Sequence, residues 1–147
     1  MKKILMSLML VAGVSTAYAE ITVQEPWVRA TVAQQKATGA FMKVTSTVAT
    51  RLVGAESPAA EFTEVHEMAM HDNVMKMRQI EALPLEAGKT VEFKPGSYHF
   101  MLLNLHEQAK EGAVLPIRLI FENADGQREQ VEVKAVVKPL ATAAHRH

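Results

Sequence analysis

The chain has 147 residues, in which 16 basic and 16 acidic side chains balance, with six histidines and no cysteine. This composition has no basic patch with interleaved aromatic residues, which argues against a nucleic-acid-binding protein. The lack of cysteine excludes a disulfide framework, a Cys-x-x-Cys redox site and a cysteine-linked lipid.

The first 19 residues have the pattern of a secretory signal peptide. Lys2 and Lys3 give a positive start, residues 4–14 are almost wholly apolar, and Ala17-Tyr18-Ala19 fits a small-x-small cleavage site. The apolar run is too short to span a bilayer, which takes about 18 or more residues. We therefore expect an exported protein that is cleaved near Ala19 and has no membrane-inserted segment.

The rest of the chain is expected to form one domain, residues 20–140, with a single core. Short apolar and β-branched runs are broken by turn residues, which is the pattern of an all-β sandwich or barrel. Asp125-Gly126 and Pro95-Gly96 are suited to tight turns. The predicted strands are Ile21 to Thr31, Thr38 to Ser46, Arg51 to Ala55, Phe62 to Met68, Val74 to Ile80, Thr90 to Phe93, Tyr98 to Leu103, Ile117 to Glu122 and Arg128 to Val137.

Two segments are expected to lie outside the strands. Leu105 to Lys110 has helical propensity sufficient for a single turn before Gly112. Residues 141–147 are small and polar and are expected to form a flexible tail that contains two histidines.

Methionines and histidines cluster in the middle of the domain, two residues apart. In an extended strand residues i and i+2 point to the same face, so each pair presents two donors together. Thioether sulfur and neutral imidazole favour Cu(I) over hard cations. Methionine also fills cores, and a single one is more often a packing residue. The clustering nevertheless favours a copper site; the pairs are His66 and Met68, Met75 and Met77, and His99 and Met101.

The spacing of four of these donors resembles a known family. Ten residues separate His66 from Met77, twenty-one separate Met77 from His99, and one separates His99 from Met101. This pattern resembles the ligand motif of the periplasmic copper chaperones called PCu(A)C, and the resemblance extends from Trp27 to about Val137. Similar segments include Trp27-Val28-Arg29-Ala30, Thr38-Gly39-Ala40, Glu64-Val65-His66, Val74-Met75-Lys76-Met77-Arg78, Ala87-Gly88 and Lys94-Pro95-Gly96. Ser97 departs from the glycine that is common in the family.

The resemblance implies a cupredoxin-like Greek-key β-sandwich or barrel in the periplasm. It also implies a Cu(I) site formed by His66, Met77, His99 and Met101. The expected partner is a copper recipient, either a cytochrome c oxidase subunit or another copper carrier. No catalytic step is implied.

The remaining donors leave alternatives open. Met68, Met70 and Met75 are auxiliary candidates, for a transfer role or for a soft apolar rim. His145 and His147 could hold Cu(II) at a secondary site or could belong to a simple polar terminus. His71 and His106 are expected to be ordinary surface residues.

Two other copper functions each require a residue that this sequence does not provide. A blue-copper electron carrier needs a cysteine ligand, and the oxygenase design that uses an N-terminal histidine conflicts with an expected mature start at Glu20. The alternative that the sequence leaves open is a copper-sequestering buffer or resistance protein without a dedicated recipient. A chaperone, unlike a buffer, requires its site to lie near the surface.

Overall fold

The computed structural model describes residues 19–139, which form ten strands and no helix. The predicted signal peptide, apart from Ala19, and the predicted tail lie outside these residues. None of the described segments is a helix long and apolar enough to span a bilayer. The strands are β1 (Ile21–Arg29), β2 (Ala37–Ser46), β3 (Thr50–Glu56), β4 (Ala60–His71), β5 (Val74–Gln79), β6 (Leu83–Leu85), β7 (Thr90–Phe93), β8 (His99–Leu105), β9 (Val114–Glu122) and β10 (Arg128–Lys138).

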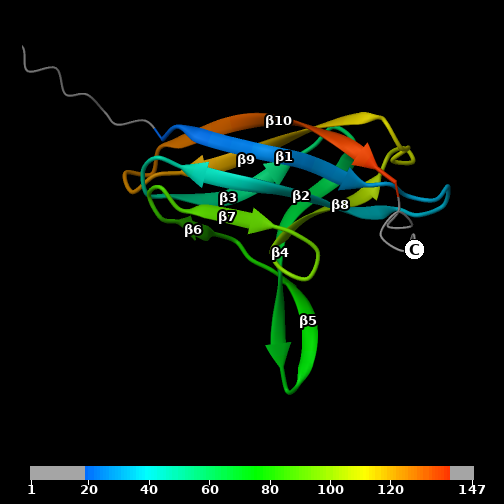
Figure 1. The fold of residues 1–147 in the computed structure, drawn as a ribbon, viewed down its shortest axis with the longest axis horizontal. Helices are drawn as coiled ribbons and strands as arrows, with labels where there is room; N and C mark the ends of the chain where they lie inside the picture. Colours follow the sequence, from blue (N-terminus) through cyan, green and yellow to red (C-terminus); the bar gives the residue numbers. More distant parts are fainter. Residues whose placement is uncertain (1–18, 140–147) are drawn as a thin grey trace, which may run out of the picture.

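Seven of the strands close into a barrel, which confirms the all-β, cupredoxin-like prediction (Figure 1). The order is β4-β8-β2-β1-β10-β9-β3, and β3 returns to pair with β4. All neighbours except β1 and β10 run antiparallel; that pair is parallel, with Trp27 opposite Val136. Closure leaves few free strand edges, because each of the seven strands has two neighbours.

The core is built by alternation along the strands. Val65 on β4 and Phe100 on β8 face the interior, where Phe100 is fully buried and stacks on Phe93 with ring centroids 4.5 Å apart. Their chain neighbours therefore point to the outer face of the same sheet. This alternation places His66 and His99 outside the apolar core, although both residues are nearly buried.

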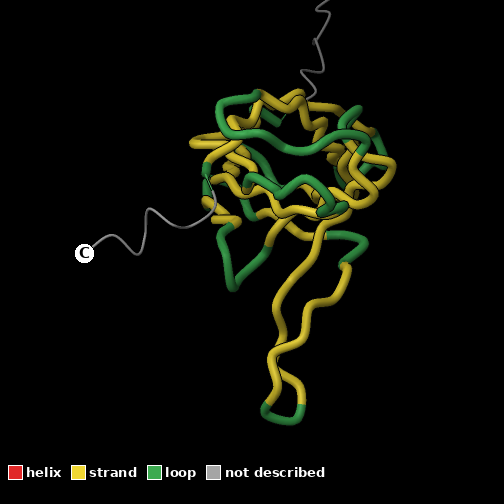
Figure 2. The backbone as a smooth tube through the Cα atoms, turned by 90° about the vertical axis from the view of Figure 1, so that its right-hand side faces the viewer, coloured by secondary structure: helices red, strands yellow, loops and turns green. Residues whose placement is uncertain are grey.

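Strands β4 and β5 continue beyond the barrel as a two-stranded projection (Figures 1 and 2). Strand β4 pairs with β8 only as far as His66, opposite His99, and from Glu67 onward it pairs with β5 alone. We call residues 67–78 the arm. Its tip is a two-residue turn in which Asp72 and Asn73 both have positive φ. That conformation is typical of hairpins, and Asn and Asp tolerate it well.

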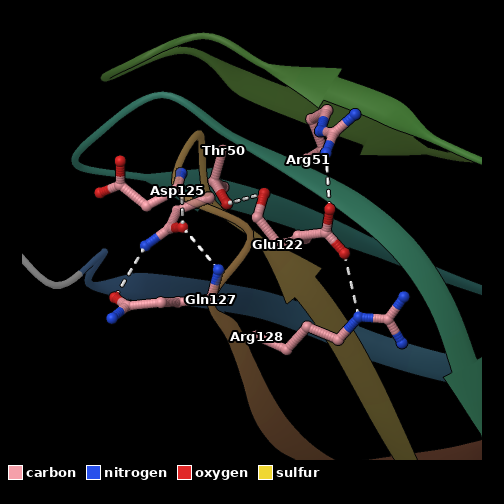
Figure 3. Close-up of polar contacts among 7 residues, drawn as sticks. Thr50, Arg51, Glu122, Asp125, Gln127 and Arg128 are labelled. Atoms are coloured by element: carbon pink, nitrogen blue, oxygen red, sulfur yellow. Dashed lines mark hydrogen bonds and ion pairs between the residues drawn. The ribbon is translucent and has the colours of Figure 1, made fainter.

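A polar cluster connects neighbouring strands at the end of the barrel where β9 turns into β10 (Figure 3). The Glu122 carboxylate accepts hydrogen bonds from Arg51 at 2.7 Å and from Arg128 at 3.0 Å, joining β3, β9 and β10. In the following turn the Asn123 side chain accepts from the backbone N–H groups of Asp125 and Gln127. Together with the positive φ of Gly126, this confirms the hairpin predicted at Asp125-Gly126.

Three details of the predicted elements were wrong. Residues 106–110 are bends and irregular chain instead of a helical turn, because their backbone bonds elsewhere: Ala109 N–H donates to Thr31 Oγ1. Strand β6 was not predicted, since a three-residue run with Pro84 at its centre is a weak strand signal. Strand β4 also extends beyond the predicted end at Met68 and runs through His71.

Candidate metal centre

Two buried histidines lie opposite each other on neighbouring strands. His66 on β4 pairs with His99 on β8, and their ring centroids are 5.7 Å apart. The two residues are only 8% and 7% exposed. Both imidazoles thus lie on the outer face of the barrel, at a separation set by the pairing of the two strands.

The Glu64 carboxylate orients the His66 ring. The His66 Nε2–H group donates to Glu64 Oε1 at 2.8 Å, since a carboxylate can only accept. In the neutral ring this leaves Nδ1 unprotonated, and Nδ1 is buried without any hydrogen-bond partner. A buried nitrogen lone pair without a partner is costly in an ordinary core and is suited to a metal ligand.

His99 is oriented by the turn that precedes it. Its Nδ1–H group donates to the Ser97 carbonyl oxygen at 2.9 Å, which leaves the Nε2 lone pair free. That nitrogen faces Met77 Sδ at 3.0 Å, from strand β5 of the arm. Two electron-pair donors therefore converge from strands that do not pair with each other. The turn at Pro95-Gly96, with positive φ at Gly96, is as predicted.

Three of the four predicted ligands line one cavity of about 290 Å³. Met77, His99 and Met101 line it, together with Met68. Met101 follows His99 on β8 and lies opposite Glu64 on β4. His66 does not line this cavity and lies beside it, next to His99. The structure therefore places all four predicted donors on adjoining strands of one face.

An aromatic wall closes the β1–β2 side of the cavity. Phe41 lies 6.4 Å from His99 and 4.6 Å from Trp27 between ring centroids. The Arg29 guanidinium stacks over Phe41 at 5.4 Å. An apolar wall of this kind limits solvent access to a metal site and so affects its ligand strength.

Gly39 makes room for the Phe41 ring, and Gly39→Ala is expected to lower the free energy of unfolding by about 1–3 kcal/mol. A Cβ at this position would lie 2.9 Å from Phe41 Cζ. Urea denaturation measures the effect. Gly54→Ala is the matched control in β3, because its Cβ would lie an ordinary 3.8 Å from Ile120 Cδ1. Equal stability of the two variants would contradict the close contact.

The other candidate residues are not part of this cluster, apart from Met68. Met70 and Met75 lie toward the tip of the arm, and His71 contacts Asp72 there at 3.4 Å. His106 is exposed in the loop after β8. His145 and His147 lie outside the described residues. Within the described chain no three His, Cys, Asp or Glu side chains form a metal-binding group.

Sequence reasoning missed three contributors to this site. Glu64 lies two residues before His66, so the same i, i+2 rule that paired the donors would have placed it on their face. The Ser97 carbonyl and the Gly39–Phe41 contact gave no comparable signal. Both depend on the turn before β8 and on the pairing of β2 with β8.

Comparison with known proteins agrees with this fold. Residues 21–137 match the family described as LpqE-like putative lipoproteins. Putative lipoprotein Lxx21020 of Leifsonia xyli subsp. xyli is 27% identical over 115 residues, covering 78% of this chain and 69% of that protein. Lipoproteins are exported proteins, although this chain has no cysteine for lipid attachment.

Solved structures show the same architecture. The copper-bound PCuAC domain from PmoF2 has a TM-score of 0.65 and 21% identity, covering 84% of this chain and 99% of that domain. Apo-DR1885 from Deinococcus radiodurans has a TM-score of 0.58 and 25% identity over 87% of each chain. DR1885 has also been solved with Cu(I), and that form is 24% identical with a TM-score of 0.53, covering 86% of this chain and 83% of its own. The chain therefore belongs to the LpqE-like family, the PCuAC copper chaperone family that its sequence predicts.

Proposed function

We propose that this protein binds Cu(I) through His66, Met77, His99 and Met101 and delivers it to the copper centre of a respiratory oxidase, directly or through another copper carrier. The observation on which this rests is the approach of His99 Nε2 to Met77 Sδ at 3.0 Å, together with the unpartnered Nδ1 of the neighbouring His66. We call this ligand set the inner centre. Copper is the cargo of the protein, and no catalytic step is proposed.

The donor set suits Cu(I) in particular. Two imidazoles and two thioethers are neutral and soft or borderline ligands, which favours the monovalent ion over Cu(II) and over oxygen-seeking cations. Each imidazole must present an unprotonated nitrogen to the metal, whereas a thioether carries no proton to lose.

The position of the donors favours transfer over storage. The two histidines are nearly buried, whereas Met77 is 49% exposed on the arm. An incoming ligand can reach the copper from the thioether side while the imidazoles still hold it. A closed core site would have favoured the alternative of a sequestering buffer, and these donors lie on the outer face of the barrel.

The cellular context is also part of the proposal. Residues 1–19 are proposed to direct export to the periplasm and to be removed near Ala19, leaving the copper-binding domain 20–140 and the tail 141–147. A secondary Cu(II) site at His145 and His147 is retained as a hypothesis. Deleting residues 141–147 should then lower the Cu(II) stoichiometry, and an unchanged stoichiometry would reject that site.

Glu64→Gln is expected to lower Cu(I) affinity by about 10–100-fold, the effect typical of a group that orients a metal ligand. The substitution weakens the hydrogen bond that fixes the tautomer of His66. Competition with a chromogenic Cu(I) chelator measures it. Glu67→Gln is the control, because Glu67 pairs with Arg78 on the opposite face of the arm. Similar affinity in both variants would remove Glu64 from the site.

A copper-transfer assay distinguishes a chaperone from a buffer. The Cu(I)-loaded protein is mixed with a soluble apo fragment that contains an oxidase copper centre, and copper uptake is followed by absorbance. A chaperone should metallate the fragment faster than a small chelator does at equal free copper. A rate no faster than that of the chelator would favour the buffer.

A further inference from the structure

The arm carries four methionines, of which the inner centre uses only Met77. Met68 pairs with Met77 across the two strands, and Met70 pairs with Met75 one step nearer the tip. Residues that pair directly, or that lie two apart, share one face of a sheet. These four residues, which we call the methionine ladder, therefore lie on a single face of the arm.

The spacing of the ladder suits a single soft ion. Directly paired residues have Cβ atoms about 4.5–5.5 Å apart, and successive pairs on a strand lie about 7 Å apart. Methionine has three rotatable side-chain bonds and can bring its sulfur to a common point across such distances. Met68, Met70 and Met75 can therefore surround one ion without any change in the backbone.

Packing does not explain why these positions are methionines. All six residues of β5 are exposed, and Met70 and Met75 are 64% and 47% exposed. Such positions gain little from an apolar side chain. The opposite face of the arm is charged, with Glu67 paired to Arg78 and Lys76 facing Ala69. Thioethers are thus concentrated on one face of the arm, at positions where packing does not require them.

The ladder is continuous with the cavity described above. Met68 lines that cavity beside Met77, whereas Met70 and Met75 do not. An ion held by Met68, Met70 and Met75 would lie next to Met77 on the arm. Met77 in turn faces His99 of the inner centre. Exchange between the two positions would replace one thioether at a time, with no proton to remove.

We propose that Met68, Met70 and Met75 form an outer Cu(I) site on the arm, from which copper enters and leaves the inner centre. The outer site stands on the geometry of the arm alone, whereas its role as an entry station rests on the proposed function. Because its donors do not titrate, the outer site keeps its affinity at acidic pH.

Three variants of the full chain test the proposal by Cu(I) titration against a chelator at pH 7 and pH 5. They are Met70→Leu with Met75→Leu, His66→Gln with His99→Gln, and all four changes combined. The wild type is expected to bind two ions, the histidine variant one ion equally well at both pH values, the methionine variant one ion, and the combined variant none. Methyl signals of Met70 and Met75 should shift with the retained ion of the histidine variant, and that of buried Met42 should not.

Each result has a separate meaning. If the methionine variant binds as many ions as the wild type, the outer site is rejected. If the histidine variant instead binds as many ions as the wild type, the proposed inner centre is rejected and the outer site is not. Should the histidine variant fail to fold, the methionine variant still decides, because its changes are confined to exposed positions of the arm.

Discussion

His99→Ala is expected to weaken Cu(I) binding by more than about 100-fold, beyond the range that the loss of an orienting group produces. The change removes the nitrogen that faces Met77 Sδ at 3.0 Å and the neighbour of His66 on the facing strand. The remaining thioethers cannot replace a neutral imidazole held in a fixed orientation by the Ser97 carbonyl. Competition with a chromogenic chelator at pH 7 measures the loss.

The control for this prediction is His106→Ala. His106 is an exposed histidine in the loop after β8, at the end of this strand opposite to His99. It lines a separate cavity that contains none of the proposed ligands. Its removal should leave Cu(I) affinity unchanged. An His99→Gln variant, whose size is closer to that of histidine, separates loss of the ligand from loss of packing. Equal affinities of the His99 and His106 variants would contradict the assignment of His99.

Phe100→Ala is expected to lower the free energy of unfolding by about 3–5 kcal/mol, as for other large aromatic side chains removed from a core. Phe100 is fully buried and stacks on Phe93. It lies between His99 and Met101 in the chain and packs on the opposite face of β8. The variant should therefore lose stability because a cavity opens directly beneath the proposed copper ligands.

Urea unfolding measures this loss, with Phe62→Ala as the control. Phe62 lies on the neighbouring strand β4, opposite Leu103 on β8, and is 55% exposed. Its removal should change the free energy of unfolding by no more than about 0.5 kcal/mol, the usual range for a surface substitution. A loss as large as that of Phe100→Ala would show that the two faces of β8 have been assigned the wrong way round.

Much of the barrel could be predicted from the sequence because its strands alternate strongly. Val131, Val133 and Ala135 alternate with charged residues, and they form β10 as expected. The turns at Asp125-Gly126 and Pro95-Gly96 depend on local backbone preferences, so they were also predictable. The four-donor spacing identified the residues that the structure gathers on one face.

Features that depend on distant parts of the chain could not be predicted in this way. The parallel pairing of β1 with β10 joins the two ends of the domain. The segment after β8 has helical propensity, but Leu105 N–H bonds to the Lys36 carbonyl and Ala109 N–H to Thr31, which keeps it irregular. Tertiary hydrogen bonds overrode the weak local preference there.

The arrangement of the site also goes beyond its sequence motif. Spacing alone treats the four donors as equivalent, whereas the structure separates two buried imidazoles on the barrel from a thioether on the arm. Figure 2 shows how this two-stranded arm projects from the barrel. Orientation comes from Glu64 and Ser97, which are not part of the motif. In the proposed site, this asymmetry would give copper a fixed side and an exchangeable side.

X-ray absorption of the protein loaded with one equivalent of Cu(I) at neutral pH tests the central claim most directly. The extended fine structure resolves nitrogen from sulfur neighbours in the first coordination shell. Binding by His66, Met77, His99 and Met101 predicts two nitrogen and two sulfur neighbours of copper, and Met77→Leu should remove one sulfur. A first shell without sulfur, or one unchanged by Met77→Leu, would contradict the proposed site.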